Sequence, residues 1–419
     1  MTLVNNRERP ESPACKDAEL YWPMPDVNMP QWLVPLSGYK PFVFSIGRVF
    51  KGSSLGAKIK RGCLCLMFRL CLLKYFLPKA VICRKADTSM IEEIRRIISD
   101  NSRGFARFFP DGASKARALV YIKQHAIGKY IYFICDENGK GSLVAKVFTR
   151  DSDASFLRAE YDNLRGIHSD FSGRGFLGAV PYPAYFGFIS GRPVYMEEFC
   201  QGRDFREKIK TPEGGRYFSA AIEWLSSFHR ATSRKGSLSL REQEEDFSRW
   251  YSENEPLLSA YFSYDALKRF MRSNFSSSIQ DMPSVFWHRD FTHYNMLIGA
   301  KGISVLDWEY SQGAGLPLAD ALTFLAFYYT DSRKIPLFES LKELFCEGGG
   351  AAKEAARVIR DYNSALNIDG GCFPFLLLSV LRDVVKIKVE RLSVNKSKED
   401  ILHFISFIIN GKGRLISLN

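Results

Sequence analysis

The sequence predicts an α+β fold in two lobes, a lobe of antiparallel strands followed by a mainly helical lobe, with an additional basic region in front of them. Short runs of β-branched and aromatic residues, separated by turn residues, recur from residue 113 to 200, as in paired strands. From residue 201 to 419 apolar residues recur at helical spacing, first between Phe218 and His229. With 419 residues, of which 46% are hydrophobic, the chain can bury a large core.

The N-terminal region is set apart by its charge. Residues 1–36 are rich in proline and polar groups and predict an extended arm, and residues 37–112 predict a basic, partly helical extension. From residue 27 to 86 there is no Asp or Glu, whereas eleven residues are basic, which accounts for nearly all of the formal net charge of +12. The partner of this charge is therefore expected to bind the N-terminal region rather than the lobes. The eleven are Lys40, Arg48, Lys51, Lys58, Lys60, Arg61, Arg69, Lys74, Lys79, Arg84 and Lys85.

An apolar segment at residues 63–77 lies within this basic region, and Arg69 and Lys74 interrupt it. A membrane-spanning helix needs about 20 uninterrupted apolar residues, so the segment does not predict one. Two interpretations stay open. The segment is either a basic helix in the interface of an anionic membrane or a helix packed on the strand lobe with its charges reaching solvent. Nucleic acid is not favoured as a partner, and salt-dependent binding to a duplex would be its sign.

The strand lobe is predicted to begin with strands at residues 118–122, 130–134 and 143–148. Lys146 lies on the third strand, and the helix that follows carries Glu160 on its apolar face. A buried carboxylate is unfavourable unless it is paired. The sequence therefore predicts an ion pair between Lys146 and Glu160.

Asp290, Asn295 and Asp307 form a set of carboxylate and amide groups suited to phosphoryl transfer from Mg-ATP. That reaction needs one carboxylate to orient the attacking hydroxyl and accept its proton. It also needs an amide oxygen and a second carboxylate to hold Mg²⁺ against the phosphates. Short apolar runs, predicted to be buried strands that fix this loop, lie at residues 284–287, 296–298 and 303–306.

This part of the chain resembles the aminoglycoside phosphotransferase and choline kinase family. Residues 288–295 match a His-x-Asp-x-x-x-x-Asn loop, Asp307-Trp308 matches the strand end that follows it, and residues 315–322 match a Gly-x-Pro-x-x-Asp element. The resemblance covers about residues 115 to 330 and implies a two-lobed protein-kinase-like fold with a five-stranded antiparallel upper lobe. It also implies ATP and Mg²⁺ as cofactors, Asp290 as the catalytic base, and Asn295 and Asp307 as metal ligands.

The resemblance extends upstream to the nucleotide. Residues 143–148 resemble the Val-Ala-Ile-Lys strand of kinases, which implies that Lys146 binds the phosphates and that Glu160 braces it. Residues 194–202 resemble the last upper-lobe strand and the hinge, where backbone groups near Glu198 and Cys200 would bind adenine. No glycine-rich loop covers the phosphates, and Gly128 is the single candidate.

Neighbouring polar residues are assigned roles separately. The resemblance implies that His229 and His288 are structural hydrogen-bonding groups rather than catalysts. Arg289 departs from the glycine that is common in small-molecule kinases and copies the His-Arg-Asp of protein kinases. For His293 and Glu309 the sequence leaves open whether they take part in the site.

The function predicted from these observations is ATP-dependent phosphorylation of a hydroxyl on a small molecule or glycan. Residues 331–419 hold 14 basic and 11 acidic side chains, so no acidic cleft for a polycationic drug is visible. A sugar or lipid-linked saccharide is accordingly favoured over an aminoglycoside. The alternatives are a protein kinase, although only seven residues separate Asp307 from Gly315, and a nucleotide-binding pseudokinase scaffold at a membrane.

The nine cysteines are scattered without metal-ligand spacing, which is typical of free thiols in a reducing compartment. No signal-peptide pattern is found at the start of the sequence. These features predict a cytoplasmic protein, with peripheral attachment to the inner face of the membrane if the basic region binds lipid.

Overall fold

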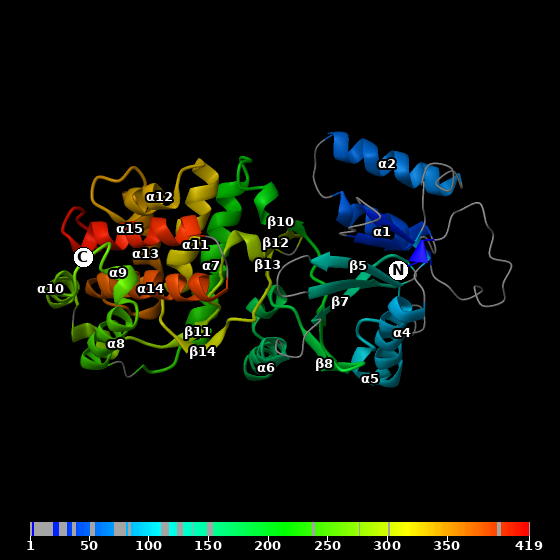
Figure 1. The fold of residues 1–419 in the computed structure, drawn as a ribbon, viewed down its shortest axis with the longest axis horizontal. Coiled ribbons are helices and arrows are strands. Elements are labelled where there is room, and N and C mark those ends of the chain that lie inside the picture. The colour runs from blue at the N-terminus through cyan, green and yellow to red at the C-terminus, as the bar shows by residue number, and fades with distance from the viewer. Residues whose placement is uncertain are drawn as a thin grey trace. The chain divides into compact units, whose positions relative to one another are not determined.

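The computed structural model divides into two compact units (Figure 1). The first unit comprises Met1–Ser172 and Val180–Gln201, and the second comprises Gly173–Ala179 and Gly202–Asn419. The structure describes residues 2–3, 20–24, 32–35, 39–50, 55–70, 81–82, 85–109, 117–123, 129–136, 138–148, 154–236, 239–275, 277–300, 302–391 and 395–418.

An antiparallel sheet of nine strands forms the centre of the first unit, in the order β1-β4-β2-β3-β5-β6-β7-β9-β8. Five of these strands form the predicted upper lobe, so the α+β, two-lobed fold class is confirmed. They are β5 (Arg117–Lys123), β6 (Lys129–Cys135), β7 (Gly141–Phe148), β8 (Pro183–Ile189) and β9 (Arg192–Glu198). In the turn between β6 and β7, Gly139 has a φ of +73°, and a Cβ there would lie 2.7 Å from the carbonyl oxygen of Lys40. Only glycine fits that turn without strain.

The other four strands come from the N-terminal region. They are β1 (Thr2–Leu3), β2 (Leu20–Met24), β3 (Trp32–Pro35) and β4 (Val81–Ile82). We predicted an extended arm over residues 1–36, and its described residues instead form short strands of the sheet. Trp32 pairs with Tyr121 and Leu33 with Val120, so β3 covers the edge of β5. An uncovered edge would leave its backbone N–H and C=O groups without partners, which is the physical reason for the difference.

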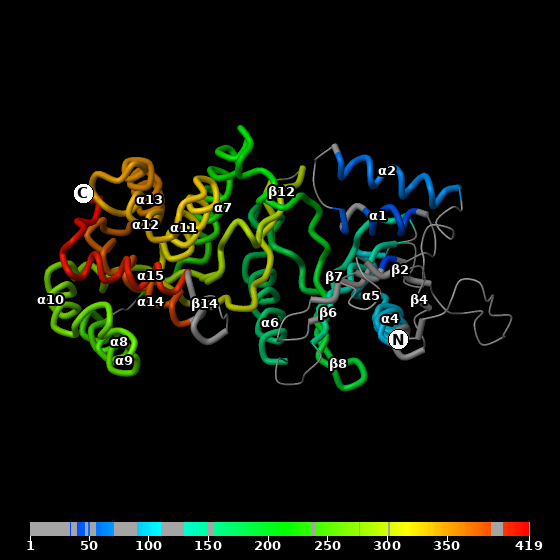
Figure 2. Tube along the Cα trace, turned by 45° about the horizontal axis from the view of Figure 1, so that its top comes forward, coloured from blue at the N-terminus to red at the C-terminus, as the bar shows by residue number. Residues whose placement is uncertain are grey.

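Helices of the first unit pack on this sheet. They are α1 (Tyr39–Val49), α2 (Leu55–Arg69), α4 (Lys85–Asp100), α5 (Ser102–Phe105) and α6 (Ala154–Asp170). The apolar face of α4 joins the main core of the unit. Figures 1 and 2 show α2 running alongside α1. Between them, Phe42 of α1 stacks on Phe68 of α2 with ring centroids 4.3 Å apart. The predicted segment 63–77 thus begins within α2, and its residues 71–77 lie outside the described part of the chain.

The second unit is mainly helical. Its helices are α7 (Gly214–Thr232), α8 (Leu240–Glu253), α9 (Glu255–Leu258), α10 (Tyr264–Asn274), α11 (Ala319–Arg333), α12 (Leu337–Phe345), α13 (Ala352–Leu366), α14 (Phe373–Arg391) and α15 (Asn395–Ile409). Short strands complete it: β10 (Arg203–Asp204), β11 (Val285–Trp287), β12 (Met296–Gly299), β13 (Gly302–Val305) and β14 (Gln312–Gly315).

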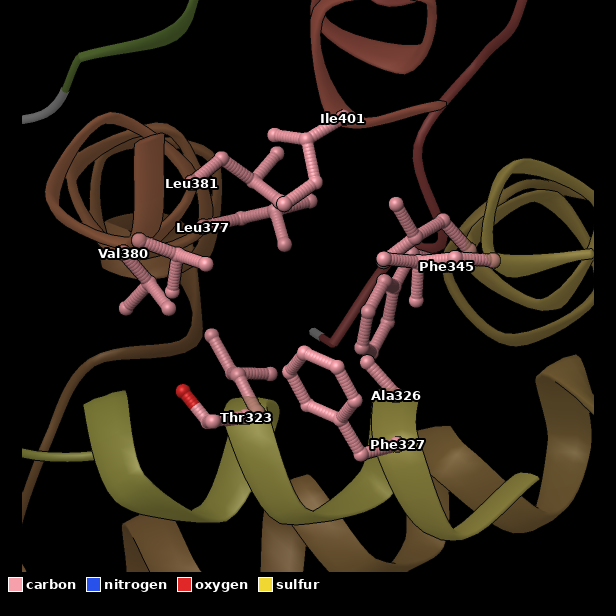
Figure 3. Close-up of a pocket in the computed structure, with 12 residues that line it drawn as sticks. Thr323, Ala326, Phe327, Phe345, Leu377, Val380, Leu381 and Ile401 are labelled. Carbon is pink, nitrogen blue, oxygen red and sulfur yellow. The ribbon is translucent and has the colours of Figure 1, made fainter. Parts of the chain in front are cut away.

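An apolar cavity lies in the core of the second unit, among α11, α12, α14 and α15 (Figure 3). Phe327, Phe345, Leu377 and Ile401 are among the side chains that line it. Its volume of about 20 Å³ is close to the minimum that holds one water molecule. It is therefore a packing gap rather than an acceptor site.

A helix that crosses a membrane must be both long and apolar. Within the described residues no single helix is both long and apolar enough to do so. One pair, Ala352–Leu366 with Gly370–Lys386, meets the criterion by length and composition together, with a bend of 116° between its helices.

Candidate active site

The loop from His288 to Asn295 connects β11 to β12 in the second unit. The three predicted apolar runs form the strands β11, β12 and β13; β12 pairs with β13 and β11 pairs with β14, both antiparallel. The backbone N–H of Leu306 donates to the carbonyl oxygen of Asn295 at 2.8 Å. This bond ties the end of the loop to the residue immediately before Asp307.

Asp290 and Asn295 are in direct contact. The amide nitrogen Nδ2 of Asn295 donates to Oδ2 of Asp290 at 2.7 Å and to its backbone carbonyl at 3.0 Å. Because the nitrogen of the amide faces Asp290, the amide oxygen is directed away from it. The structure thus brings together a carboxylate whose orientation is fixed and an amide oxygen that can bind a cation.

Asp320 holds the other end of the loop. Its side chain is completely buried at the start of α11, where it accepts hydrogen bonds from the backbone N–H groups of His288 and Arg289 at 2.8 and 2.9 Å. Nε2 of His229 lies 3.3 Å from the same carboxylate, and Nδ1 of His229 bonds the hydroxyl of Tyr362. The sequence motif contained Asp320 but gave it no role. Its bonds show that it positions the loop.

Replacing Asp320 with Asn is expected to destabilise the protein by about 2–3 kcal/mol, because an amide has one acceptor oxygen for two backbone donors. The loop should also lose its fixed position, which lowers turnover by about a hundredfold. Urea unfolding and kcat measure the two effects. The exposed carboxylate of Asp281 provides the matched control as Asp281→Asn, and equal losses in both variants would contradict a positioning role.

His288 is buried with both ring nitrogens bonded. Nδ1 accepts from the backbone N–H of Asp290 at 3.3 Å, so the proton resides on Nε2, which donates to the carbonyl of Leu306 at 3.1 Å. Burial lowers the pKa of His288 below its ordinary value of 6.5, although the carboxylate of Asp320 opposes the shift. A neutral ring that bonds only backbone groups fits the predicted structural role.

The pH dependence of stability follows from His288 and His293. Burial lowers the pKa of both rings from 6.5, so the unfolded chain binds protons that the folded protein does not. The stability they contribute is complete above pH 6.5 and is lost as the pH falls from there towards the lower folded pKa values. Each ring contributes a slope of at most about 1.4 kcal/mol per pH unit.

Urea unfolding at about pH 7.5 and about pH 5.5 measures this dependence. The difference should shrink in the double variant His288→Asn, His293→Asn, which lacks both titrating groups. The interpretation fails if that variant loses as much stability on acidification as the wild type does.

Three residues of the motifs, Arg289, Asp307 and Leu318, have a left-handed backbone. Arg289 has a φ of 66° and Asp307 a φ of 58°, values that are uncommon for residues other than glycine. Such strain concentrates at functional sites and persists where the surroundings enforce it. For Arg289 the surroundings include Asp383, 2.8 Å from Nη2, and the ring of Trp287. The arginine that departed from the small-molecule pattern is thus anchored to α14.

His293 and Glu309, whose part in the site the sequence leaves open, differ in their surroundings. Nε2 of His293 is 2.8 Å from Oδ2 of Asp331, and the hydroxyl of Tyr294 donates to the same oxygen at 2.6 Å. The His293 ring is fully buried, which favours a structural part for it. Glu309 is half-buried two residues after Asp307, so its role stays a prediction.

The donor set suits Mg²⁺, which prefers oxygen ligands and usually keeps waters and phosphate oxygens in its coordination shell. Within the described residues no group of three or more His, Cys, Asp or Glu could hold a metal by itself. A site built from Asn295 and Asp307 would therefore depend on the phosphates of a nucleotide for its remaining ligands.

In the first unit, Lys146 and Glu160 meet as predicted. Nζ of Lys146 on β7 lies 2.6 Å from Oε1 of Glu160 on α6, and both side chains are buried. Glu197 on β9 is a second ionic partner, 3.0 Å from the same nitrogen, and it accepts from the hydroxyl of Tyr195 at 3.0 Å. Burial, and then the charge of Glu197, raise the pKa of that hydroxyl well above its ordinary value. Tyr195 therefore stays a hydrogen-bond donor.

Sequence reasoning missed Glu197. It is paired across the sheet with Val144, two residues along the strands from the Lys146–Tyr195 pair. The available signal was alternation along β9, which places Glu197 on the same face as Tyr195.

The residues predicted near adenine lie at the end of β9. The backbone N–H of Glu198 donates to the carbonyl of Tyr182 at 2.9 Å, so it is already engaged within the unit. The side chain of Glu198 is half-buried, with Arg107 at 4.0 Å. Cys200 follows two residues beyond the strand and is half-buried. Because the N–H of Glu198 is already bonded, its carbonyl oxygen is the backbone group to which the prediction of adenine binding applies. Gly128 lies outside the described residues.

Three of the solved structures to which this chain is similar are an aminoglycoside phosphotransferase, a choline kinase and a glucosamine kinase. An aminoglycoside phosphotransferase in ternary complex with ADP and hygromycin B is 12% identical, with 75% of this chain and 99% of that chain covered and a TM-score of 0.45. A choline kinase from Cryptosporidium parvum Iowa II is 13% identical, with coverage of 77% and 97% and a TM-score of 0.42. A glucosamine kinase is 11% identical, with coverage of 73% and 82% and a TM-score of 0.38.

Sequence comparison identifies the family. No curated protein matches the chain in sequence. The profile described as the phosphotransferase enzyme family matches residues 130–358, which is more than half of the chain and includes both Lys146 and the loop at Asp290. The resemblance seen in the motifs is thereby confirmed, and the chain belongs to the phosphotransferase enzyme family.

Proposed function

We propose that the protein transfers the γ-phosphoryl group of Mg-ATP to a hydroxyl of a small molecule or glycan. The observation that carries the proposal is the contact of Asn295 Nδ2 with Asp290 Oδ2 at 2.7 Å. It fixes the carboxylate of Asp290, and the bond from Leu306 to Asn295 brings the start of the Asp307 segment to the same loop.

In this proposal Asp290 orients the acceptor hydroxyl and takes its proton as the oxygen attacks the γ-phosphorus. The bond from that phosphorus to the β–γ bridging oxygen breaks, and ADP leaves. Asn295 and Asp307 would hold Mg²⁺, which when bound neutralises charge on the phosphates. Lys146 would bind phosphate oxygens, with Glu160 holding its ammonium in place, and the carbonyl of Glu198 and the backbone of Cys200 would bind adenine.

The acceptor is proposed to be neutral or anionic, a sugar or lipid-linked saccharide in preference to an aminoglycoside. The C-terminal residues 331–419 hold 14 basic and 11 acidic side chains, so they offer no excess of negative charge to a polycation. A protein acceptor is disfavoured because β14 pairs with β11 at Val285 and Gly315, which occupies the short connection after Asp307. That connection has no room for an activation segment.

The test measures ATP consumption against a panel of sugars, amino alcohols and aminoglycosides, with the Asp290→Asn variant as the blank. Turnover with a neutral sugar that disappears in the variant is expected. Turnover with aminoglycosides alone would contradict the proposed acceptor class. Binding of Mg-ATP without consumption on any acceptor would indicate a nucleotide-binding scaffold instead of an enzyme.

A further inference from the structure

Helix α2 presents an apolar stripe to solvent. Ile59, Cys63, Leu66 and Leu70 are spaced by four, three and four residues, so they lie on one face of the helix. Leu70 extends that face because its backbone N–H donates to the carbonyl of Leu66 at 2.9 Å. The side chains of Ile59, Leu66 and Leu70 are 55%, 57% and 57% exposed, and Cys63 is exposed as well.

This exposure is unusual for the protein. Of the six large apolar side chains that are exposed in the described part of the chain, three belong to this stripe. A different face of α2 is anchored: Leu64, Met67 and Phe68 pack on the small core of the N-terminal region. The helix is therefore held in place by one face while the other remains uncovered.

The charges around the stripe are all positive. Lys58 and Arg69 lie on one flank and Lys60 on the other, at about 100° per residue around the helix. All three are exposed. Residues 27–86, which include α2, contain no Asp or Glu.

We infer that this face of α2 binds the surface of an anionic membrane, with Ile59, Cys63, Leu66 and Leu70 below the headgroups and the flanking cations among the lipid phosphates. An interfacial helix needs an apolar face bordered by basic residues, and α2 has both. Nucleic acid would use the cations but leaves the aliphatic stripe unexplained. Packing of the helix on the strand lobe, the other interpretation left open by the sequence, accounts for one face of α2 only. The protein is thereby placed peripherally at a leaflet rich in anionic lipid, independently of which acceptor it phosphorylates.

The experiment is co-sedimentation of the full chain with vesicles of phosphatidylcholine alone or mixed with phosphatidylserine. Binding to the mixed vesicles is expected, and it should weaken as salt rises. The triple variant Lys58→Gln, Lys60→Gln, Arg69→Gln should bind about a hundredfold more weakly, since each cation near the surface contributes about fivefold. The double variant Ile59→Glu, Leu66→Glu should lose at least about tenfold through lost apolar insertion.

Two matched controls lie elsewhere in the first unit. Phe188→Glu changes an exposed apolar residue on β8, and Arg96→Gln removes an exposed cation from α4. Both should bind vesicles like the wild type, and circular dichroism should show every variant folded. Equal binding to neutral vesicles, equal losses in the controls, or binding to a nucleic acid duplex or a second copy of the chain in place of vesicles would overturn the inference.

Discussion

Replacement of Asp290 by Asn is expected to lower kcat by about a factor of 10² to 10⁴, the usual contribution of a positioned general base. The Asn side chain retains an oxygen that can accept from Nδ2 of Asn295, so the 2.7 Å contact that orients position 290 can persist. The Kd for Mg-ATP should stay within about twofold of the wild-type value, because Asp290 acts on the acceptor hydroxyl rather than on the nucleotide.

The kinetics are measured by coupled ATP consumption, and nucleotide binding by calorimetry. Asp281→Asn makes the same chemical change at an exposed position of the same unit and should leave both quantities unchanged. Wild-type kcat in Asp290→Asn would remove Asp290 from the chemistry.

The second large effect is expected at Lys146. In Lys146→Met the carboxylates of Glu160 and Glu197, which are 0% and 4% exposed, lose the ammonium between them. Breaking a buried ion pair by removing one partner costs about 3–5 kcal/mol. Urea unfolding should therefore show a large loss of stability, and Mg-ATP turnover should disappear because the phosphates lose their cation.

A triple variant separates the loss of stability in Lys146→Met from its loss of turnover. Lys146→Met, Glu160→Gln, Glu197→Gln removes all three charges and should recover most of the stability, because no uncompensated carboxylate remains buried. Its turnover should stay absent. If the triple variant is no more stable than Lys146→Met, the loss does not arise from stranded charge. If it regains activity, Lys146 does not act on the nucleotide.

The single variant Glu197→Gln is the control for Lys146→Met and for the triple variant. The cluster of Lys146, Glu160 and Glu197 carries one ammonium and two carboxylates, so the single change removes the excess negative charge. The Tyr195 hydroxyl can still donate to the amide oxygen. Stability close to that of the wild type is expected, in contrast to Lys146→Met.

The parts of the site that could be predicted are those set by local chemistry. Asp290, Asn295 and Asp307 lie within a short stretch, and their residue types define the reaction they suit. The Lys146–Glu160 pair was also predictable, because helical spacing buried Glu160 and a buried carboxylate requires a cation. The structure places Lys146 and Glu160 2.6 Å apart.

The parts that could not be predicted depend on register and tertiary packing. Glu197 reaches Lys146 through the pairing of β9 with β7, and nothing local in the sequence fixes that register. Asp320 reaches the backbone of His288 from 32 residues away. Likewise, the strands β1 to β3 exist through pairing across the chain, where the Pro-rich residues 1–36 predict an extended arm. Which face of α2 is covered depends on the packing of Phe68 against Phe42.

The most direct test of the central claim is a calorimetric titration of a non-hydrolysable ATP analogue into the wild type and Asp307→Asn, with and without Mg²⁺. The wild type is expected to bind the analogue more tightly with Mg²⁺, and Asp307→Asn is expected to lose most of this enhancement because the metal ligand is removed. Nucleotide binding that ignores Mg²⁺ in the wild type, or an undiminished Mg²⁺ effect in Asp307→Asn, would contradict a magnesium–nucleotide site at Asn295 and Asp307.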